Sequence, residues 1–310
     1  MTRPVRAGVI GVGYLGAFHA EKYAALEGVA LVGVVDADAD RAAAIAARTG
    51  TTAHTDYRAL IGQVDCVSVA VPTQFHFAIA HDLLSHGIDV LVEKPMSSDV
   101  TDGRALVDAA ERHGRILQVG HLERFNPAIR ALTTIVTQPR FIECHRLAPF
   151  VERGTDVDVI LDLMIHDLDV ILSLVQGEVQ AVEAVGVPVL SENIDIANAR
   201  IRFAGGCIAN ITASRVALKR ERKLRIFQAD TYVSVDYGEK HVRVCRRVPM
   251  NGEPTITVDE HDLDSGDALA DEIAHFVEAV RTRQRPLVDG RTALRALEVA
   301  ELIRSRLETV

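Results

Sequence analysis

The chain has 310 residues, of which 48% are hydrophobic and 25% charged. This composition is ordinary for a soluble globular protein and excludes a disordered, collagen-like or coiled-coil chain, while the length suits two domains. With 34 basic and 43 acidic residues the net charge is -9, which argues against nucleic acid or an anionic membrane as the main partner.

The first third of the chain alternates β-branched runs with alanine-rich helical stretches, as in βαβ units around a parallel sheet. The expected strands are Val5–Ile10, Ala30–Val35, Cys66–Val71, Asp89–Val92 and Ile116–Val119. The expected helices are Leu15–Leu26, Asp38–Thr49, Phe75–His86 and Asp99–His113. Each helix ends near a glycine that can take the left-handed cap conformation, namely Gly28, Gly50, Gly87 and Gly114.

After about Gly120 the pattern changes to helix, helix and then many adjacent strands. We expect helices over Phe125–Thr137 and Thr155–Val175. The strand-like segments are Val179–Leu190, Ala197–Phe203, Cys207–Ser214, Leu224–Ala229, Tyr232–Tyr237, His241–Arg247 and Thr255–Glu260. Such a run predicts a mostly antiparallel sheet with one face covered by helices and one open to a partner. Two amphipathic helices, Leu269–Arg283 and Thr292–Leu307, close the chain.

The predicted fold class is therefore α/β. Residues 1–120 form a doubly wound parallel sheet, and residues 121–310 form an α+β domain with an open, mostly antiparallel sheet. The four cysteines form no CxxC pair and lack a histidine at zinc-site spacing, so we expect reduced thiols and no metal. Without a signal peptide or an apolar stretch of about 18 residues, a cytoplasmic protein is expected.

A glycine-rich segment, GVIGVGYLG over residues 8–16, joins the first expected strand to the first expected helix. In that context GxGxxG predicts a Rossmann dinucleotide site: Gly11 allows the tight turn, Gly13 lets the backbone approach a pyrophosphate, and Gly16 lets the helix pack on the strand. Asp36 ends the second strand, where an acidic residue binds the adenosine ribose, and favours NAD over NADP. As an alternative, Asp36 caps the helix that follows.

Three further segments end strands or occupy helices where a ligand would bind. Pro72, Thr73 and His76 follow the third strand, although Pro72 can also simply shape the loop and His76 cap the helix. Glu93-Lys94-Pro95 ends the fourth strand, where a lysine can bind a reacting hydroxyl or remain a solvated charge. Asp162 and His166 lie four apart on one helix, where a carboxylate can orient a general base. The alternative is a surface ion pair, with Asp167 and Asp169 as solvated acids.

Taken together, these motifs resemble the Gfo/Idh/MocA family of NAD(P)-dependent sugar and polyol dehydrogenases over the whole chain, including Glu272–Phe276 near its end. The resemblance implies an NAD-dependent enzyme in which His166 is the general base, Asp162 orients it, and Lys94 contacts hydroxyl and cofactor. It also implies that residues 121–310 bind substrate and form a homodimer or homotetramer through the open sheet, and that a cis peptide precedes Pro95.

A finer resemblance, carried by VGHLERFNP over residues 119–127 and by Asp162–Asp167, is to the branch that oxidises C3 of UDP-N-acetylglucosamine. It implies a UDP-sugar substrate and a functional link to a sugar aminotransferase, for lipid A or another surface glycan. Free sugars, inositol or a UDP-uronate stay open as substrates, and a non-catalytic NAD-binding sensor is the alternative of another class.

From these observations the candidate residues are assigned in two groups. The predicted cofactor contacts are Gly11, Gly13, Tyr14, Leu15, Gly16, Asp36, Pro72, Thr73, His76, Glu93 and Lys94. The predicted substrate contacts are Glu123, Arg124, Asn126, Arg153 and His166. Arginine suits a diphosphate, and Arg124, Arg146, Arg153 and Arg215 are the candidates for that contact.

Overall fold

The computed structural model describes residues 3–151, 157–250, 253–263 and 266–309, and its packing forms two compact units. One unit comprises Met1–Leu122 and Asp267–Leu297, and the other comprises Glu123–Gly266 and Glu298–Val310. The prediction divided the chain once, at residue 120, and its assignment of functions to the two parts stays a prediction. The chain re-enters the first unit after Gly266, because the helix that begins at Ala268 buries its apolar face in the core of that unit.

The first unit contains a six-stranded parallel sheet in the order β3-β2-β1-β4-β5-β6. The strands are β1 Val5–Ile10, β2 Val29–Val35, β3 Thr52–His54, β4 Cys66–Val69, β5 Asp89–Glu93 and β6 Leu117–Gly120. The helices of this unit are α1 Tyr14–Ala25, α2 Ala39–Thr49, α3 His76–Ser85, α4 Val100–Arg112, α7 Ala268–Thr282 and most of α8 Gly290–Ser305. Short 3₁₀ turns cover Tyr57–Leu60, Thr73–Phe75 and Leu122–Phe125.

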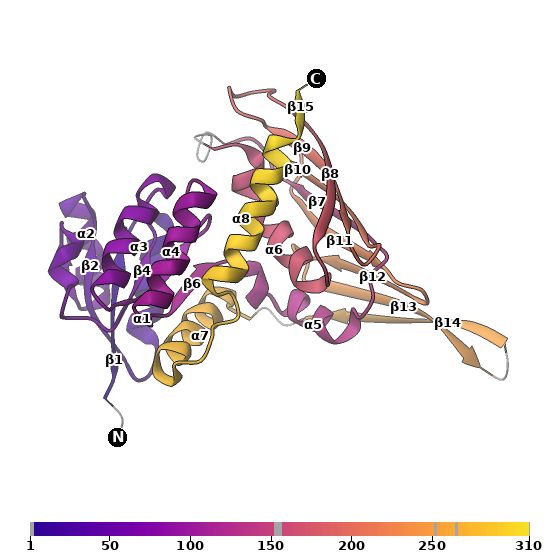
Figure 1. The fold of residues 1–310 in the computed structure, drawn as a ribbon. Coiled ribbons are helices and arrows are strands. Elements are labelled where there is room, and N and C mark those ends of the chain that lie inside the picture. Colours follow the sequence, from indigo (N-terminus) through magenta and orange to yellow (C-terminus); the bar gives the residue numbers. More distant parts are fainter. Residues whose placement is uncertain (1–2, 152–156, 251–252, 264–265, 310) are drawn as a thin grey trace. The chain divides into compact units, whose positions relative to one another are not determined.

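The strand order reverses between β1 and β4. Right-handed crossovers then put α1 and α2, which contact each other, on one face and α3 and α4 on the other. Figure 1 shows α3 and α4 side by side. This confirms the predicted doubly wound sheet, and the predicted left-handed glycines all have positive φ angles between 59° and 77°. Ligands of such sheets bind where the strand order reverses, at the carboxyl ends of β1 and β4.

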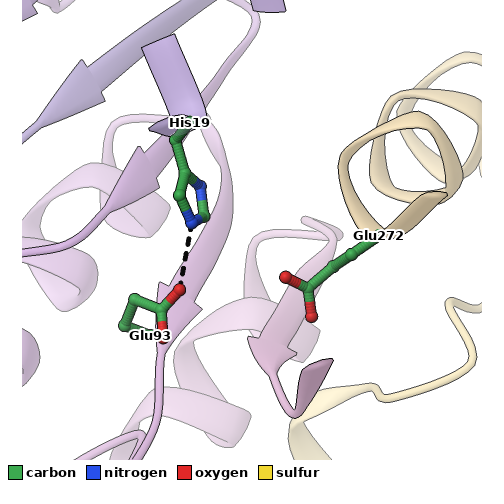
Figure 2. A group of neighbouring side chains, drawn as sticks. All are labelled: His19, Glu93 and Glu272. Carbon is green, nitrogen blue, oxygen red and sulfur yellow. Dashed lines mark hydrogen bonds and ion pairs between the residues drawn. The ribbon is translucent and has the colours of Figure 1, made fainter. Parts of the chain in front are cut away.

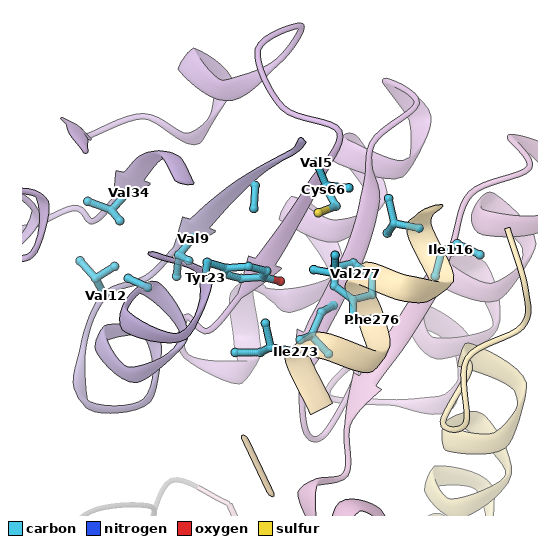
Figure 3. Close-up of a cluster of buried hydrophobic side chains, with 14 of the residues drawn as sticks. Val5, Val9, Val12, Tyr23, Val34, Cys66, Ile116, Ile273, Phe276 and Val277 are labelled. Carbon is cyan, nitrogen blue, oxygen red and sulfur yellow. The ribbon is translucent and has the colours of Figure 1, made fainter. Parts of the chain in front are cut away.

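Helix α7 completes the core of the first unit. Its Ile273, Phe276 and Val277 join Tyr23 of α1 and valines of β1 and β2 in one buried cluster (Figure 3). Residues three and four apart lie on the same face of a helix, so the apolar residues that made this segment amphipathic in the sequence form the face that α7 buries here.

The second unit contains a nine-stranded sheet in the order β14-β13-β12-β11-β7-β10-β9-β8-β15. Its strands are β7 Phe141–Leu147, β8 Val179–Val187, β9 Ile196–Phe203, β10 Ile208–Ser214, β11 Glu221–Phe227, β12 Thr231–Asp236, β13 His241–Met250, β14 Glu253–Asp262 and β15 Leu307–Thr309. All neighbours run antiparallel except β10 with β7 and β15 with β8. The predicted mostly antiparallel sheet is confirmed.

Helical segments on this sheet are α5 Pro127–Ile135, a π-helical turn over Ile160–Met164, and α6 Ile165–Leu174. The turn packs on β10 and α5 packs on β12. A helix was expected over Thr155–Val175, but residues 155 and 156 lie outside the described residues, and the described part begins with π rather than α geometry. In the described residues, none of the helices has both the length and the apolar character needed to cross a membrane.

Candidate functional site

The glycine-rich turn between β1 and α1 has the shape that a pyrophosphate requires. Gly11 has a φ of +81°, and a Cβ on Gly16 would lie 1.8 Å from the Gly11 carbonyl oxygen, so neither position accepts a side chain. A Cβ on Gly13 would meet no atom within 4 Å. The backbone of Gly13 is therefore open to a ligand at the amino-terminal end of α1, where unpaired N–H groups attract phosphate.

Apolar side chains are exposed around this turn. Tyr14 and Leu15, both predicted to contact the cofactor, begin α1 and are 66% and 39% exposed. Phe18 of α1 packs edge-on against Tyr14, and Phe75 after β4 is also exposed. Exposed large apolar groups at the carboxyl edge of a parallel sheet are typical of a binding surface.

Asp36 lies directly after β2 and its carboxylate is held in place. It accepts hydrogen bonds from the backbone N–H groups of Val12, at 2.9 Å, and Asp38, at 3.0 Å. Arg41, half-exposed on α2, pairs with it at 3.2 Å. The cap of α2 is Asp38, which accepts from the N–H of Arg41, so the alternative reading of Asp36 as the cap is wrong. Its role as ribose ligand stays a prediction.

His76 begins α3 and is buried, with both ring nitrogens on backbone carbonyls. Nδ1 lies 2.8 Å from the Pro95 oxygen and Nε2 lies 2.8 Å from the Val71 oxygen. Burial lowers the pKa of His76, although the two carbonyls oppose that change. The ring thus braces the loop that follows β4 against the loop that follows β5. Pro72 and Thr73, between Val71 and His76, are more exposed.

Lys94 follows β5 directly and is half-buried. The peptide bond between Lys94 and Pro95 is cis, which confirms that expectation. The preceding residue, Glu93, faces inward: its Oε1 lies 3.0 Å from Nε2 of His19. Burial opposes ionisation, but the hydrogen bond and charge of His19 prevail and lower the pKa of Glu93.

Two residues of this site were missed by the sequence analysis, His19 on α1 and Glu272 on α7. Together with Glu93 they form a group whose ligand-capable atoms lie within 4.8 Å of one another (Figure 2). Nδ1 of His19 also lies 3.0 Å from Oγ of Ser68, which in turn lies 2.9 Å from the hydroxyl of Tyr23. The chain therefore supplies a buried polar network directly behind Lys94.

In the second unit, Asp162 lies in the π-helical turn and His166 in the first turn of α6, both half-buried. Single π-helical turns are rare and occur preferentially at functional sites. Asp167 and Asp169 are buried rather than solvated, which corrects that alternative. Each has an arginine partner, which offsets the cost of burying a carboxylate.

Arg146, on β7, is the centre of this charged group. Its guanidinium donates to both oxygens of Asp167, at 2.8 and 2.9 Å, and to Glu123 at 3.2 Å, while being only 3% exposed. Burial opposes the charge, but the two carboxylates raise the pKa of Arg146. Arg222 reaches the same Glu123 at 3.5 Å. Arg146 is thus committed to internal carboxylates and does not fit its predicted role as a diphosphate ligand.

The remaining predicted substrate residues lie around the same group. Arg124 pairs with Asp169 at 3.4 Å, and Asn126 caps α5 by accepting from the N–H of Ala128. Arg215 is buried against Asp195 at 2.8 Å, so it too is held inside the second unit. Arg153 lies outside the described residues.

Comparison with known proteins matches two domains of one protein family to successive parts of this chain. The model of an oxidoreductase family with an NAD-binding Rossmann fold, Gfo/Idh/MocA, matches residues 5–121, and the model of the family's carboxyl-terminal domain matches residues 128–232. The chain belongs to the Gfo/Idh/MocA family. The resemblance inferred from the motifs is confirmed, and residues 5–121 match the NAD-binding Rossmann domain of this oxidoreductase family.

Among relatives, UDP-N-acetylglucosamine 3-dehydrogenase of Acidithiobacillus ferrooxidans is 41% identical, with 98% of this chain and 97% of that protein covered. A solved structure of that organism's enzyme superposes with a TM-score of 0.92, at 40% identity and with 99% and 98% of the two chains covered. Inositol 2-dehydrogenase of Rubrobacter xylanophilus is 30% identical over 69% of this chain and 65% of its own length.

Proposed function

We propose that this enzyme oxidises the C3 hydroxyl of UDP-N-acetylglucosamine to a 3-keto sugar with NAD⁺. The observation that carries the proposal is the 41% identity, over nearly the whole of both chains, with an enzyme of that name. The match to inositol 2-dehydrogenase is weaker and shorter, so free sugars, inositol and UDP-uronates are the competing substrates.

The residues assigned to the chemistry are Lys94, Asp162 and His166. His166 takes the proton of the C3 hydroxyl, since imidazole suits a general base near neutral pH. Asp162, one turn earlier, orients that ring, and Lys94 donates a hydrogen bond to the same hydroxyl and so favours loss of its proton. Bound NAD⁺ supplies the acceptor for the C3 hydride.

Cofactor binding is assigned to the first unit. The open backbone at Gly13 holds the pyrophosphate, and the carboxylate of Asp36 accepts hydrogen bonds from the ribose hydroxyls. Because this carboxylate repels a 2′-phosphate, NAD is preferred over NADP. Tyr14, Leu15, Pro72 and Thr73 line the exposed edge around the turn.

Substrate contacts are assigned to Glu123, Arg124, Asn126 and Arg153, in addition to His166. The diphosphate requires cationic partners, and Arg124, with one longer ion pair to Asp169 at 3.4 Å, is less committed than Arg146, which pairs with Asp167 at 2.8 Å and with Glu123. We further propose a cytoplasmic homodimer or homotetramer that associates through the open sheet. Its 3-keto product is a ketone, which a sugar aminotransferase converts to a 3-amino sugar for lipid A or another surface glycan.

The test follows NADH absorbance while purified enzyme, NAD⁺ and UDP-N-acetylglucosamine are mixed, with an aminotransferase and glutamate to remove the ketone. NADH formed with this sugar, but not with free sugars, inositol or a UDP-uronate, supports the proposal. His166→Ala should abolish turnover while leaving NAD⁺ affinity unchanged. Unchanged turnover in that variant rejects the assignment of the base, and NAD⁺ binding without turnover on any substrate favours a sensor.

A further inference from the structure

The group formed by His19, Glu93 and Glu272 buries two carboxyl groups beside one imidazole. The side chains of His19 and Glu93 are 1% and 13% exposed, and Glu272 is fully buried. Figure 2 shows Glu272 projecting from α7 toward the hydrogen-bonded pair of the other two residues. Both oxygens of Glu272 are buried with no hydrogen-bond partner among the described residues.

Charge balance decides the form of this group. The imidazole of His19 supplies at most one positive charge, and its hydrogen bond goes to Glu93. A second ionised carboxylate would be buried without compensation, which is far less favourable than binding a proton. Burial, followed by the charge of Glu93, raises the pKa of Glu272 well above its usual range.

The other titratable groups around the network do not supply a second positive charge at Glu272. Burial raises the pKa of both Tyr23 and Cys66, which keeps them neutral. Lys94 and His76 act electrostatically on Glu93, whose pKa is lowered. The negative charge of the group therefore resides on Glu93.

We propose that Glu272 is a positioning residue: it stays a neutral carboxylic acid and donates a hydrogen bond to the Glu93 carboxylate, which fixes the end of β5 that carries Lys94. The ligand-capable atoms of the two residues lie at most 4.8 Å apart, and the proposed hydrogen bond requires the Glu272 carboxyl group to rotate toward Glu93. This inference rests on the proposed function, in which Lys94 contacts the reacting hydroxyl.

The residues around Glu93 hold its carboxylate in one position. On one side, His19 links Glu93 through Ser68 to Tyr23. On another, a Cβ on Gly120 would lie 3.0 Å from Oε2 of Glu93, so β6 packs closely against the carboxylate. A donor from α7 completes the set, and it comes from a helix that the chain adds to the Rossmann unit only near its end.

A divalent cation would balance the same charges, and the donors include a histidine and two carboxylates, but the direct hydrogen bond between His19 and Glu93 favours the proton. Nε2 of His19 and Oε1 of Glu93 are 3.0 Å apart, a normal hydrogen-bond length. Tetrahedral coordination with bonds near 2.1 Å would separate two such ligand atoms by about 3.4 Å. Octahedral coordination with the same bond length would separate adjacent ligand atoms by about 3.0 Å, so the metal content of the purified enzyme is the direct test of a cation.

The experiment compares wild type with Glu272→Gln, Glu272→Leu and a matched control, Glu278→Gln, on the exposed face of the same helix. The first readout is the infrared difference spectrum at neutral pH. Wild type minus Glu272→Gln should contain the carbonyl stretch of a protonated carboxylic acid, and wild type minus Glu278→Gln should lack it. Thermal unfolding and NAD⁺ affinity establish that each variant is folded.

Turnover provides the second readout. Glutamine keeps a neutral donor at the position, so kcat of Glu272→Gln should stay within about threefold of wild type. Leucine removes the donor, so kcat of Glu272→Leu should fall about tenfold by misplacing Lys94, with KM for NAD⁺ unchanged. Leaving Glu278→Gln at wild-type turnover excludes a general effect of altering α7.

Two results would overturn the inference. One is the absence of the carboxylic acid band; the other is a stoichiometric divalent metal in wild type that Glu272→Gln loses together with its turnover. Because the infrared band does not depend on substrate, its absence rejects the inference alone. Failure of wild type to oxidise any sugar, with the band present, rejects the proposed function instead.

Discussion

The two units neutralise buried carboxyl groups in different ways. In the second unit, Asp167 and Glu123 share the guanidinium of Arg146 through bonds of 2.8 to 3.2 Å. In the first unit, Glu93 and Glu272 have the imidazole of His19 beside them. Both groups are buried next to residues assigned to catalysis, His166 in one case and Lys94 in the other.

Because one group is neutralised by arginine and the other by a proton, the two groups should respond differently to pH and to mutation. Arginine keeps its charge at every pH that a folded protein tolerates, so the cation of the second unit's group does not titrate and the group is sensitive to loss of that one residue. A proton, by contrast, leaves when the pH rises. The first unit's group should therefore be the pH-sensitive one of the two.

The largest effect is expected for Arg146→Leu. Removing the guanidinium leaves the buried Asp167 without its ion-pair partner and leaves the half-buried Glu123 with Arg222, which lowers the free energy of unfolding by about 3–5 kcal/mol. Denaturant titration measures it. The control is Arg243→Leu, which removes an exposed pair with Glu260 and should lower stability by about 1 kcal/mol or less. Equal losses in the two variants would contradict the distinction between buried and exposed pairs.

The second prediction concerns pH and Glu272. Its folded-state pKa is raised, so above about pH 4.5 the folded state keeps a proton that the unfolded chain has released. The contribution of this bound proton to the free energy of unfolding is thus complete at acidic pH. It is lost as the pH rises, by about 1.4 kcal/mol per pH unit, until the pH passes the pKa of Glu272 in the folded state. Urea titrations at about pH 6 and about pH 8 should show a larger loss of the free energy of unfolding in wild type than in Glu272→Gln. Parallel pH profiles for the two proteins would refute it.

The third prediction tests whether Glu93 is immobile. A Cβ on Gly120 would lie 3.0 Å from Oε2 and 3.1 Å from Cδ of Glu93, and His19 prevents that carboxylate from moving away. Gly120→Ala should therefore lower the free energy of unfolding by about 1–2 kcal/mol. Gly205→Ala is the matched control, since its added Cβ meets its nearest neighbour at 3.6 Å. If both variants unfold like wild type, the carboxylate is free to shift.

Elements of the fold could be predicted from the sequence where a short, continuous stretch of residues carried the pattern. Strand β1 was predicted with its observed bounds, because a β-branched run next to a glycine-rich turn is a local pattern. Strand β7 was missed although it is central in its sheet. Its buried residues alternate with half-buried ones, as expected for a strand, but one of the buried residues is Arg146. Arginine is usually exposed, so the sequence did not indicate a buried position there. The edge strand β3 has three residues, too few for any periodicity.

The same distinction separates the residues of the candidate site. The glycine turn and Asp36 belong to one βαβ unit, so their spacing could be interpreted directly. His19, Glu93 and Glu272 come from α1, β5 and α7, and only the fold brings them together. One signal was available: Glu272 occupies the same helical face as Ile273 and Phe276, and a carboxylate among apolar positions requires a partner.

The smallest effect comes from deleting one hydroxyl in each group. Tyr23 bonds to Oγ of Ser68 at 2.9 Å, within the network that ends at Glu93, so Tyr23→Phe should lower the free energy of unfolding by about 1 kcal/mol. The hydroxyl of Tyr237, whose ring lies 5.8 Å from the Arg146 guanidinium carbon, is buried with no hydrogen-bond partner among the described residues. Tyr237→Phe should therefore change stability by less than about 0.5 kcal/mol or raise it.

The pair of variants is informative because the chemical change is identical in both units. Denaturant titration of the two, under the same conditions, compares a hydroxyl inside a connected network with one beside a network that arginine has already neutralised. A loss in Tyr237→Phe equal to that in Tyr23→Phe would show that the second group also depends on a hydroxyl. The contrast between a proton-balanced and an arginine-balanced group would then have to be abandoned, because both would rely on uncharged donors.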